Sequence, residues 1–137
     1  MSASSPDIAH DTAFRPEAND RPTRIRVDLE AIGHNFHALQ AHAGVPVMGI
    51  VKANAYGHGL VPVALHLQAQ GIGQFGVALV EEGLALRRAG VSVPILVMGG
   101  IHAPQVSQFL ACDLEVTVSS IAKLGQVAQA AEALHRK

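Results

Sequence analysis

Four short apolar segments recur along the sequence at similar intervals, and this repetition restricts the fold more than any other feature. The segments begin near residues 47, 75, 94 and 114 and read VMGIV, FGVAL, PILVM and LEVTV. A short, continuous apolar run is typical of a parallel strand that is covered on both faces. Because each run is followed by residues with helical spacing, the chain predicts an α/β fold of about four βα units with a parallel sheet.

The segments between these runs carry helix signals. After Gly59, apolar residues share one helical face until Gly71. The segment 81–89 has acidic residues in its first turn, arginines in its last turn and Gly90 directly after it, as the helix dipole favours. A third helix is expected after Pro104, and a fourth begins after Ser119 or Ser120, either of which can cap it. The apolar face predicted for the fourth helix comprises Ile121, Leu124, Ala128 and Ala131.

A strand and a helix are predicted ahead of the first unit. RIRVDL (24–29) alternates like a strand, and the residues from Leu29 to Ala43 then follow a helical period up to Gly44. Residues 1–22 mix Ser, Asp, Pro and Asn with isolated apolar residues and are predicted to be a disordered tail. The folded part is therefore expected to span residues 23–137.

Four βα units do not complete a closed sheet. A parallel barrel covers its inner face only when about eight strands close the ring. The chain must therefore be either a small, flat, doubly wound sheet with helices on both sides or part of something larger, namely a partial (β/α)8 TIM-type barrel. Exposed sheet edges and an apolar inner face favour association over a monomer.

Composition excludes several classes of partner. The chain has 137 residues, of which 49% are hydrophobic and 15% charged, and its net charge of -1 provides no basic surface for nucleic acid. No segment approaches the roughly 20 apolar residues that a membrane span requires. The single cysteine, Cys112, cannot form an internal disulfide, and this favours a reducing, cytoplasmic compartment.

Lys52 is the strongest candidate for chemistry, because it follows the apolar run 47–51 directly. The carboxyl ends of parallel strands are where α/β folds place their functional groups. A lysine there offers a primary amine, a nucleophile that can condense with an aldehyde. Tyr56 is the only tyrosine, and Gly57 and Gly59 allow a tight turn into a helix whose N-terminal N–H groups suit an anion such as phosphate.

The segment KANAYGHG (52–59), preceded by VMGIV, resembles the cofactor-lysine motif of alanine racemases, pyridoxal-phosphate enzymes built as a barrel followed by a β domain. The similarity extends to three further segments: RPTRIRVDLEAIGHN (21–35), FGVALVEEGLALRRAGVSVPILVMGG (75–100) and LEVTVSS (114–120). The resemblance implies that residues 23–137 are the N-terminal part of the pyridoxal-phosphate-binding barrel.

The resemblance also implies roles for two residues. Lys52 would carry pyridoxal 5'-phosphate as an internal aldimine and act at the substrate α-carbon, and the Tyr56 hydroxyl would help to hold the phosphate. The family interconverts L- and D-alanine as a homodimer and supplies D-alanine for peptidoglycan. Its second base is a tyrosine of the partner's β domain, outside the matched segment, so we expect this chain alone, as a truncated form, to be inactive.

Other interpretations of the sequence remain open. The protein could be a broader-specificity amino-acid racemase, or a non-catalytic α/β fragment that binds pyridoxal phosphate. No metal site is expected from the three histidines near Asp28 and Glu30, namely His34, His37 and His42. His34 and His37 could share one face of a helix, but they lack a third ligand at suitable spacing. GIGQFG (71–76) matches a dinucleotide-binding pattern, but it lies between a helix and a strand, in the reverse of the required order.

Overall fold

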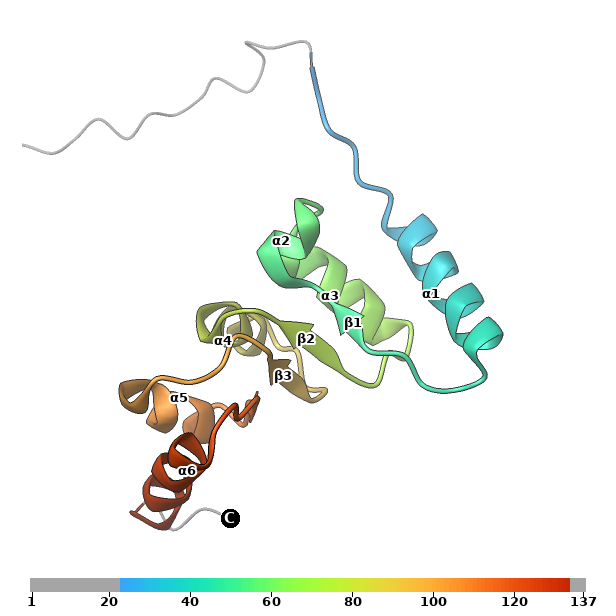
Figure 1. Cartoon of the computed structure of the whole chain (residues 1–137). Coiled ribbons are helices and arrows are strands. Elements are labelled where there is room, and N and C mark those ends of the chain that lie inside the picture. The colour runs from blue at the N-terminus through green and yellow to red at the C-terminus, as the bar shows by residue number, and fades with distance from the viewer. Residues whose placement is uncertain (1–22, 134–137) are drawn as a thin grey trace, which may run out of the picture.

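The computed structural model describes residues 23–133, and the predicted tail, residues 1–22, lies outside the described residues. The centre is a parallel sheet of four strands in the order β1-β2-β3-β4 (Figure 1). The strands are β1 (Gly49–Ile50), β2 (Phe75–Val77), β3 (Ile95–Val97) and β4 (Glu115–Val116). All four predicted strands are confirmed, although each is shorter than its apolar run.

The helices follow the strands in the predicted order. They are α1 (Leu29–Ala43), α2 (Lys52–Tyr56), α3 (Leu60–Ala69), α4 (Val80–Arg88), the 3-10 turn η1 (Ala103–Gln105), α5 (Val106–Ala111) and α6 (Ile121–Ala133). Helix α3 packs between α1 and α4, and α4 also contacts β2 and β3, so these three helices form one layer beside the sheet (Figure 1). None of the helices in the described part of the chain is long and apolar enough to cross a membrane.

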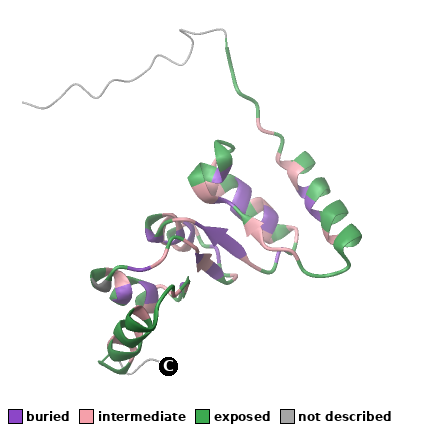
Figure 2. Ribbon diagram, in the orientation of Figure 1, coloured by how far each residue is buried: buried purple, intermediate pink, exposed green. Residues whose placement is uncertain are grey.

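The core lies between the sheet and this helix layer. Phe75 pairs in register with Ile95, and Val77 with Val97. These four side chains are at most 1% exposed, and β2, which carries two of them, is coloured as buried in Figure 2. Ile95 faces α4, because a Cβ placed on Gly83 would lie 3.7 Å from the Cγ2 of Ile95.

The opposite face of the sheet is less covered. Side chains alternate between the two faces of a strand, so the register partners Ile50, Gly76 and Leu96 share the face that points away from α4. Ile50 remains 38% exposed on this face. One face buried under helices and one partly open face are what a partial (β/α)8 barrel requires, and a doubly wound sheet does not fit.

The prediction of a strand at 24–29 is wrong. Residues 23–28 adopt no regular secondary structure, and Ile25 is 88% exposed. Asp28 is instead the N-cap of α1, where its Oδ1 accepts a hydrogen bond from the amide of Ala31 at 3.0 Å. Alternation stabilises a strand only when a neighbouring strand completes its backbone hydrogen bonds, and the sheet runs from β1 to β4 without this segment.

The last helix is where predicted, but its buried face is different. Ser120 caps α6 through a hydrogen bond from the amide of Lys123 to its Oγ at 3.2 Å, which confirms one of the two predicted caps. Most of the predicted face is exposed, with Ile121 at 89% and Leu124 at 55%, and only Ala131 is partly buried. Val127 and Ala130 pack against the core instead. Helical spacing predicts which residues share a face, but the position of the neighbouring elements decides which face is covered.

Candidate functional site

Lys52 lies at the carboxyl end of β1, as the sequence predicts. The amide of Val51, the residue before it, still bonds across the sheet to the carbonyl of Gly76 at 2.9 Å. The chain then leaves the sheet at Lys52, which is the first residue of the short element α2 and is partly buried. The backbone directly before Lys52 is thus held in the sheet, and this fixes the point from which the lysine side chain starts.

The residues after Lys52 form a left-handed turn. Four consecutive non-glycine residues have positive φ angles between 51° and 56°: Ala53, Asn54, Ala55 and Tyr56. The left-handed conformation costs an L-amino acid other than Gly roughly 1–2 kcal/mol. The sequence does not predict this feature, because alanine is the residue that most favours the right-handed helix.

Backbone hydrogen bonds close the turn on itself. The amide of Ala55 bonds to the carbonyl of Val51 at 2.8 Å, and the amide of Gly59 bonds to the carbonyl of Asn54 at 2.9 Å. Gly57 follows at a φ of 89° and bonds to the carbonyls of Ala53 and Asn54. Gly57 and Gly59 therefore serve the tight turn that their position predicts.

Glu82 of α4 connects this turn to the next βα unit. Its Oε1 accepts a hydrogen bond of 2.7 Å from the amide of Ala53, the residue after Lys52. Its Oε2 accepts bonds from the amides of Ala78, at 2.9 Å, and Leu79, at 3.1 Å, and so caps α4. The sequence identified Glu82 only as an acid in a first helical turn, and the second role has no local signal because the partner is 29 residues away.

A side chain of the left-handed turn caps the N-terminus of α3. The Oδ1 of Asn54 accepts a hydrogen bond of 2.8 Å from the amide of Leu60, the first residue of α3. Pro62, in the same first turn, has no amide hydrogen. The expectation that this helix end presents free N–H groups to an anion is therefore wrong for these two positions.

Two more side chains of the motif are placed by the turn. Tyr56 is 61% exposed, so its hydroxyl is accessible from solvent. The Nδ1 of His58 lies 2.9 Å from the carbonyl oxygen of Ala55. Because a carbonyl only accepts hydrogen bonds, Nδ1 carries the proton in this contact. His58 thus helps to hold the turn, a role that the sequence did not reveal.

The donor set of this turn fits an aldehyde-bearing phosphate ester such as pyridoxal phosphate. Lys52 offers a primary amine for the aldehyde, and Tyr56 offers an exposed hydroxyl that can donate to a phosphate oxygen. Within residues 23–133, no three His, Cys, Asp or Glu side chains lie close enough together to hold a metal ion. His37 bonds to Gln70 instead, at 3.0 Å.

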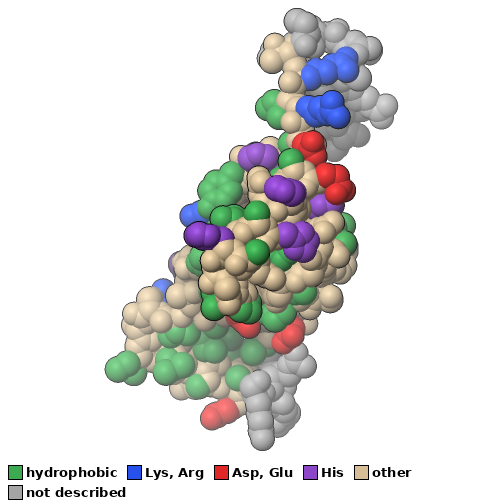
Figure 3. Space-filling view, turned by 90° about the vertical axis from the view of Figure 1, so that its right-hand side faces the viewer, with side chains coloured by type: hydrophobic (Ala, Val, Ile, Leu, Met, Phe, Trp, Pro, Cys, Tyr) green, Lys and Arg blue, Asp and Glu red, His purple; other side chains and the backbone are tan. Residues whose placement is uncertain are grey.

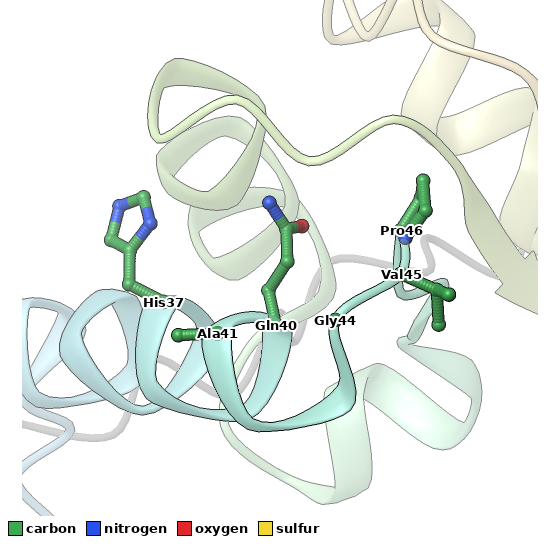
Figure 4. A pocket seen from close by; sticks show the side chains of 6 residues that line it. All are labelled: His37, Gln40, Ala41, Gly44, Val45 and Pro46. Atoms are coloured by element: carbon green, nitrogen blue, oxygen red, sulfur yellow. The ribbon is translucent and has the colours of Figure 1, made fainter.

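Two hollows of the surface lie elsewhere. One, of about 580 Å³, is formed at the end of α1, where His37 and Gln40 project from the same helix (Figure 4). The other, about 470 Å³, is an apolar groove lined in part by Phe36, Leu39 and Val47. Figure 3 shows histidine side chains gathered on the face of the molecule that carries α1. Lys52 and Tyr56 line neither hollow.

Most of the chain is similar to one family of known proteins. Residues 27–137 match the family "Alanine racemase, N-terminal domain". Alanine racemase 1 of Caldanaerobacter subterraneus subsp. tengcongensis is 44% identical over 103 residues, which cover 74% of this chain and 26% of that protein. The alanine racemase of Symbiobacterium thermophilum is 46% identical over 107 residues, 77% of this chain and 28% of that protein.

Solved structures agree with the sequence relatives. The crystal structure of alanine racemase from E. faecalis superposes with a TM-score of 0.76 and 36% identity, covering 82% of this chain and 31% of that chain. The chain thus spans less than a third of the length of these relatives. The similarity includes the βα units that carry Lys52 and Glu82.

Proposed function

Because this chain belongs to the family of alanine racemase N-terminal domains, we propose that it carries the cofactor lysine of a racemase that interconverts L- and D-alanine. In this proposal Lys52 binds pyridoxal 5'-phosphate and acts at the substrate α-carbon. The observation that carries the proposal is the position of Lys52, partly buried where β1 leaves the sheet and followed by a turn held in one conformation.

The chemistry divides between the cofactor and the protein. When bound, pyridoxal phosphate supplies an aldehyde that bonds to a primary amine and a ring that withdraws electrons from the substrate α-carbon. Lys52 supplies that amine, and the same nitrogen, when free, removes or returns the proton of the α-carbon. The Tyr56 hydroxyl would donate a hydrogen bond to the phosphate, since Tyr56 lies in the same turn as Lys52 and has an exposed side chain.

Racemisation needs a second proton donor or acceptor. A proton must leave one face of the α-carbon and another must arrive on the opposite face, so a single amine is insufficient. The second group must act from the side opposite to Lys52. Tyr56 is the only tyrosine of the chain, but it lies in the same turn as Lys52 and is already assigned to the phosphate. We therefore propose that the second group comes from the later β domain of a partner subunit in a homodimer.

The proposal has a direct chemical test. The purified chain is incubated with pyridoxal phosphate, reduced with borohydride, digested and analysed by mass spectrometry. We expect the reduced cofactor on Lys52 in preference to Lys123 and Lys137. Lys123→Arg is the matched control and should label as the unaltered chain does, whereas Lys52→Arg should lose the label. Equal labelling of all lysines would contradict the assignment of Lys52.

Catalysis is tested separately from cofactor binding. We expect no measurable racemisation of alanine by the 137-residue chain alone, and activity when a complementary C-terminal fragment of a racemase is added. Turnover by the chain alone would contradict the role given to the partner subunit. Binding without turnover in both assays would favour the alternative of a non-catalytic, cofactor-binding α/β fragment, and turnover of several amino acids would favour a broader-specificity racemase.

The proposed biological role follows from the proposed reaction. D-alanine made by the complete racemase would serve peptidoglycan synthesis, and the enzyme would work in the cytoplasm. Cys112 is a free, partly buried thiol, which suits a reducing compartment.

A further inference from the structure

Glu82 is the side chain of another βα unit that bonds to the backbone next to Lys52. It lies in the first turn of α4, yet its Oε1 reaches the amide of Ala53 at 2.7 Å. We propose that Glu82 is a positioning residue for Lys52, which acts by holding the left-handed turn through this amide. The inference rests on the proposed function, because it concerns the residue that would bind the cofactor.

The turn needs an external acceptor at this position. Ala53 is the first of the residues with positive φ, so its conformation sets the direction in which the chain leaves Lys52. In the first turn of a short helical element the amide N–H groups lack partners within the element. A carboxylate is a stronger acceptor than water or a neutral carbonyl for such a group. Without Glu82, this N–H would bond to water instead, and no side chain would hold the disfavoured backbone conformation in place.

Both oxygens of the carboxylate are used. Oε2 accepts from the amides of Ala78 and Leu79, while Oε1 accepts from Ala53. A glutamine amide has one oxygen and one NH2 group, and the NH2 group only donates. With its oxygen toward Ala78 and Leu79, where two bonds are made, a glutamine would place its NH2 group against the N–H of Ala53. Glu82→Gln therefore keeps the cap of α4 and removes the contact with the turn.

This selectivity makes Glu82→Gln the deciding variant and Glu81→Gln its matched control. Glu81 is the preceding residue and is exposed, and its substitution removes the same charge. The first measurement, on the chain without cofactor, is the hydrogen-exchange rate of the Ala53 amide by NMR. The second is borohydride labelling of Lys52 relative to Lys123 after incubation with pyridoxal phosphate. Circular dichroism during heating reports whether each variant is folded.

We expect Glu82→Gln to remain folded, to exchange the Ala53 amide about tenfold faster and to lose about tenfold in the ratio of Lys52 to Lys123 labelling, as removal of a charge-assisted bond predicts. Glu81→Gln should match the unaltered chain in all three measurements. The proposal is overturned if Glu82→Gln keeps either the exchange rate of the Ala53 amide or the labelling ratio of the unaltered chain. It is also overturned if Glu82→Gln unfolds, because Glu82 would then serve general stability.

The design separates this inference from the proposed function. If Lys52 is not labelled even in the unaltered chain, the proposed function fails. The exchange rate of Ala53 in Glu82→Gln then decides by itself whether Glu82 holds the turn. If Lys52 is labelled equally in the unaltered chain and in Glu82→Gln, the proposed function stands and the positioning role is rejected.

Discussion

The Oδ1 atom of Asn54 accepts a hydrogen bond from the amide of Leu60 at 2.8 Å, and this contact joins the left-handed turn to the start of α3. Asn54 itself has a φ of 56°. Asparagine tolerates this conformation better than most residues because its short polar side chain bonds locally. One side chain thus serves both the turn after Lys52 and the cap of the following helix.

Asn54→Ala should therefore destabilise the chain. Loss of a capping side chain typically costs about 1 kcal/mol, and alanine is also less suited to the left-handed conformation. Asn35→Ala, an exposed asparagine inside α1, is the control and should raise stability by a few tenths of a kcal/mol through helix propensity. Urea denaturation of both variants measures the two effects, and a loss of similar size in both would contradict the role of Asn54.

Glycine should have opposite effects at two exposed alanines. Ala53 has a φ of 52°, where glycine is free of the steric cost that alanine bears, so Ala53→Gly should stabilise the chain by about 1 kcal/mol or less. Ala41 lies inside the right-handed helix α1, where Ala→Gly should destabilise by about 1 kcal/mol. Thermal unfolding of the pair tests the left-handed turn, and a loss of stability in both variants would argue against it.

Gly33 of α1 should not tolerate a methyl group. A Cβ at this position would lie 2.8 Å from the Nε2 of His66 and 3.3 Å from the Cγ of Gln70, both from the α3 segment. We expect Gly33→Ala to destabilise by about 1–2 kcal/mol, because overpacking outweighs the gain in helix propensity. The double variant Gly33→Ala with His66→Ala should be less destabilised than the two single effects added together.

Gly125 provides the control for that substitution. It lies inside α6, and apart from the adjacent backbone of its own helix a Cβ there meets no atom within 4 Å. Gly125→Ala should therefore stabilise the chain by about 1 kcal/mol through helix propensity alone. Urea denaturation compares the two alanine variants. Equal effects at Gly33 and Gly125 would show that α1 and α3 are not as closely packed as the structure has them.

Arg87 should contribute more to stability than its neighbour Arg88. Its guanidinium donates hydrogen bonds to four backbone carbonyls in two different loops: Val91, Val93, Cys112 and Asp113. Arg87→Ala should cost about 2–3 kcal/mol, since bonds from a charged donor are stronger than neutral ones. Arg88 is exposed, so Arg88→Ala should change stability by less than about 0.5 kcal/mol. Urea denaturation of the two variants decides between these expectations.

Much of the fold could be predicted because its signals are local. The four apolar runs became the four strands, and the caps and glycines near the helix ends indicated where the chain turns. The same local signal predicts Lys52 at the end of β1, since a strand ends where its apolar run ends. The prediction of a strand at 24–29 was wrong because a strand needs a partner strand that the local sequence does not reveal. The predicted buried face of α6 was wrong because burial depends on which elements lie next to the helix.

The sequence by itself determined the order of strands and helices and the position of Lys52 along it. Only the tertiary structure decided that Ala53 and its neighbours turn left-handed and that Glu82 anchors them. Local propensity opposes that turn, so its conformation depends on hydrogen bonds that include one from another βα unit. A contact between residues 29 positions apart leaves no periodic pattern in the chain, and folding of the sheet is what brings its two partners together.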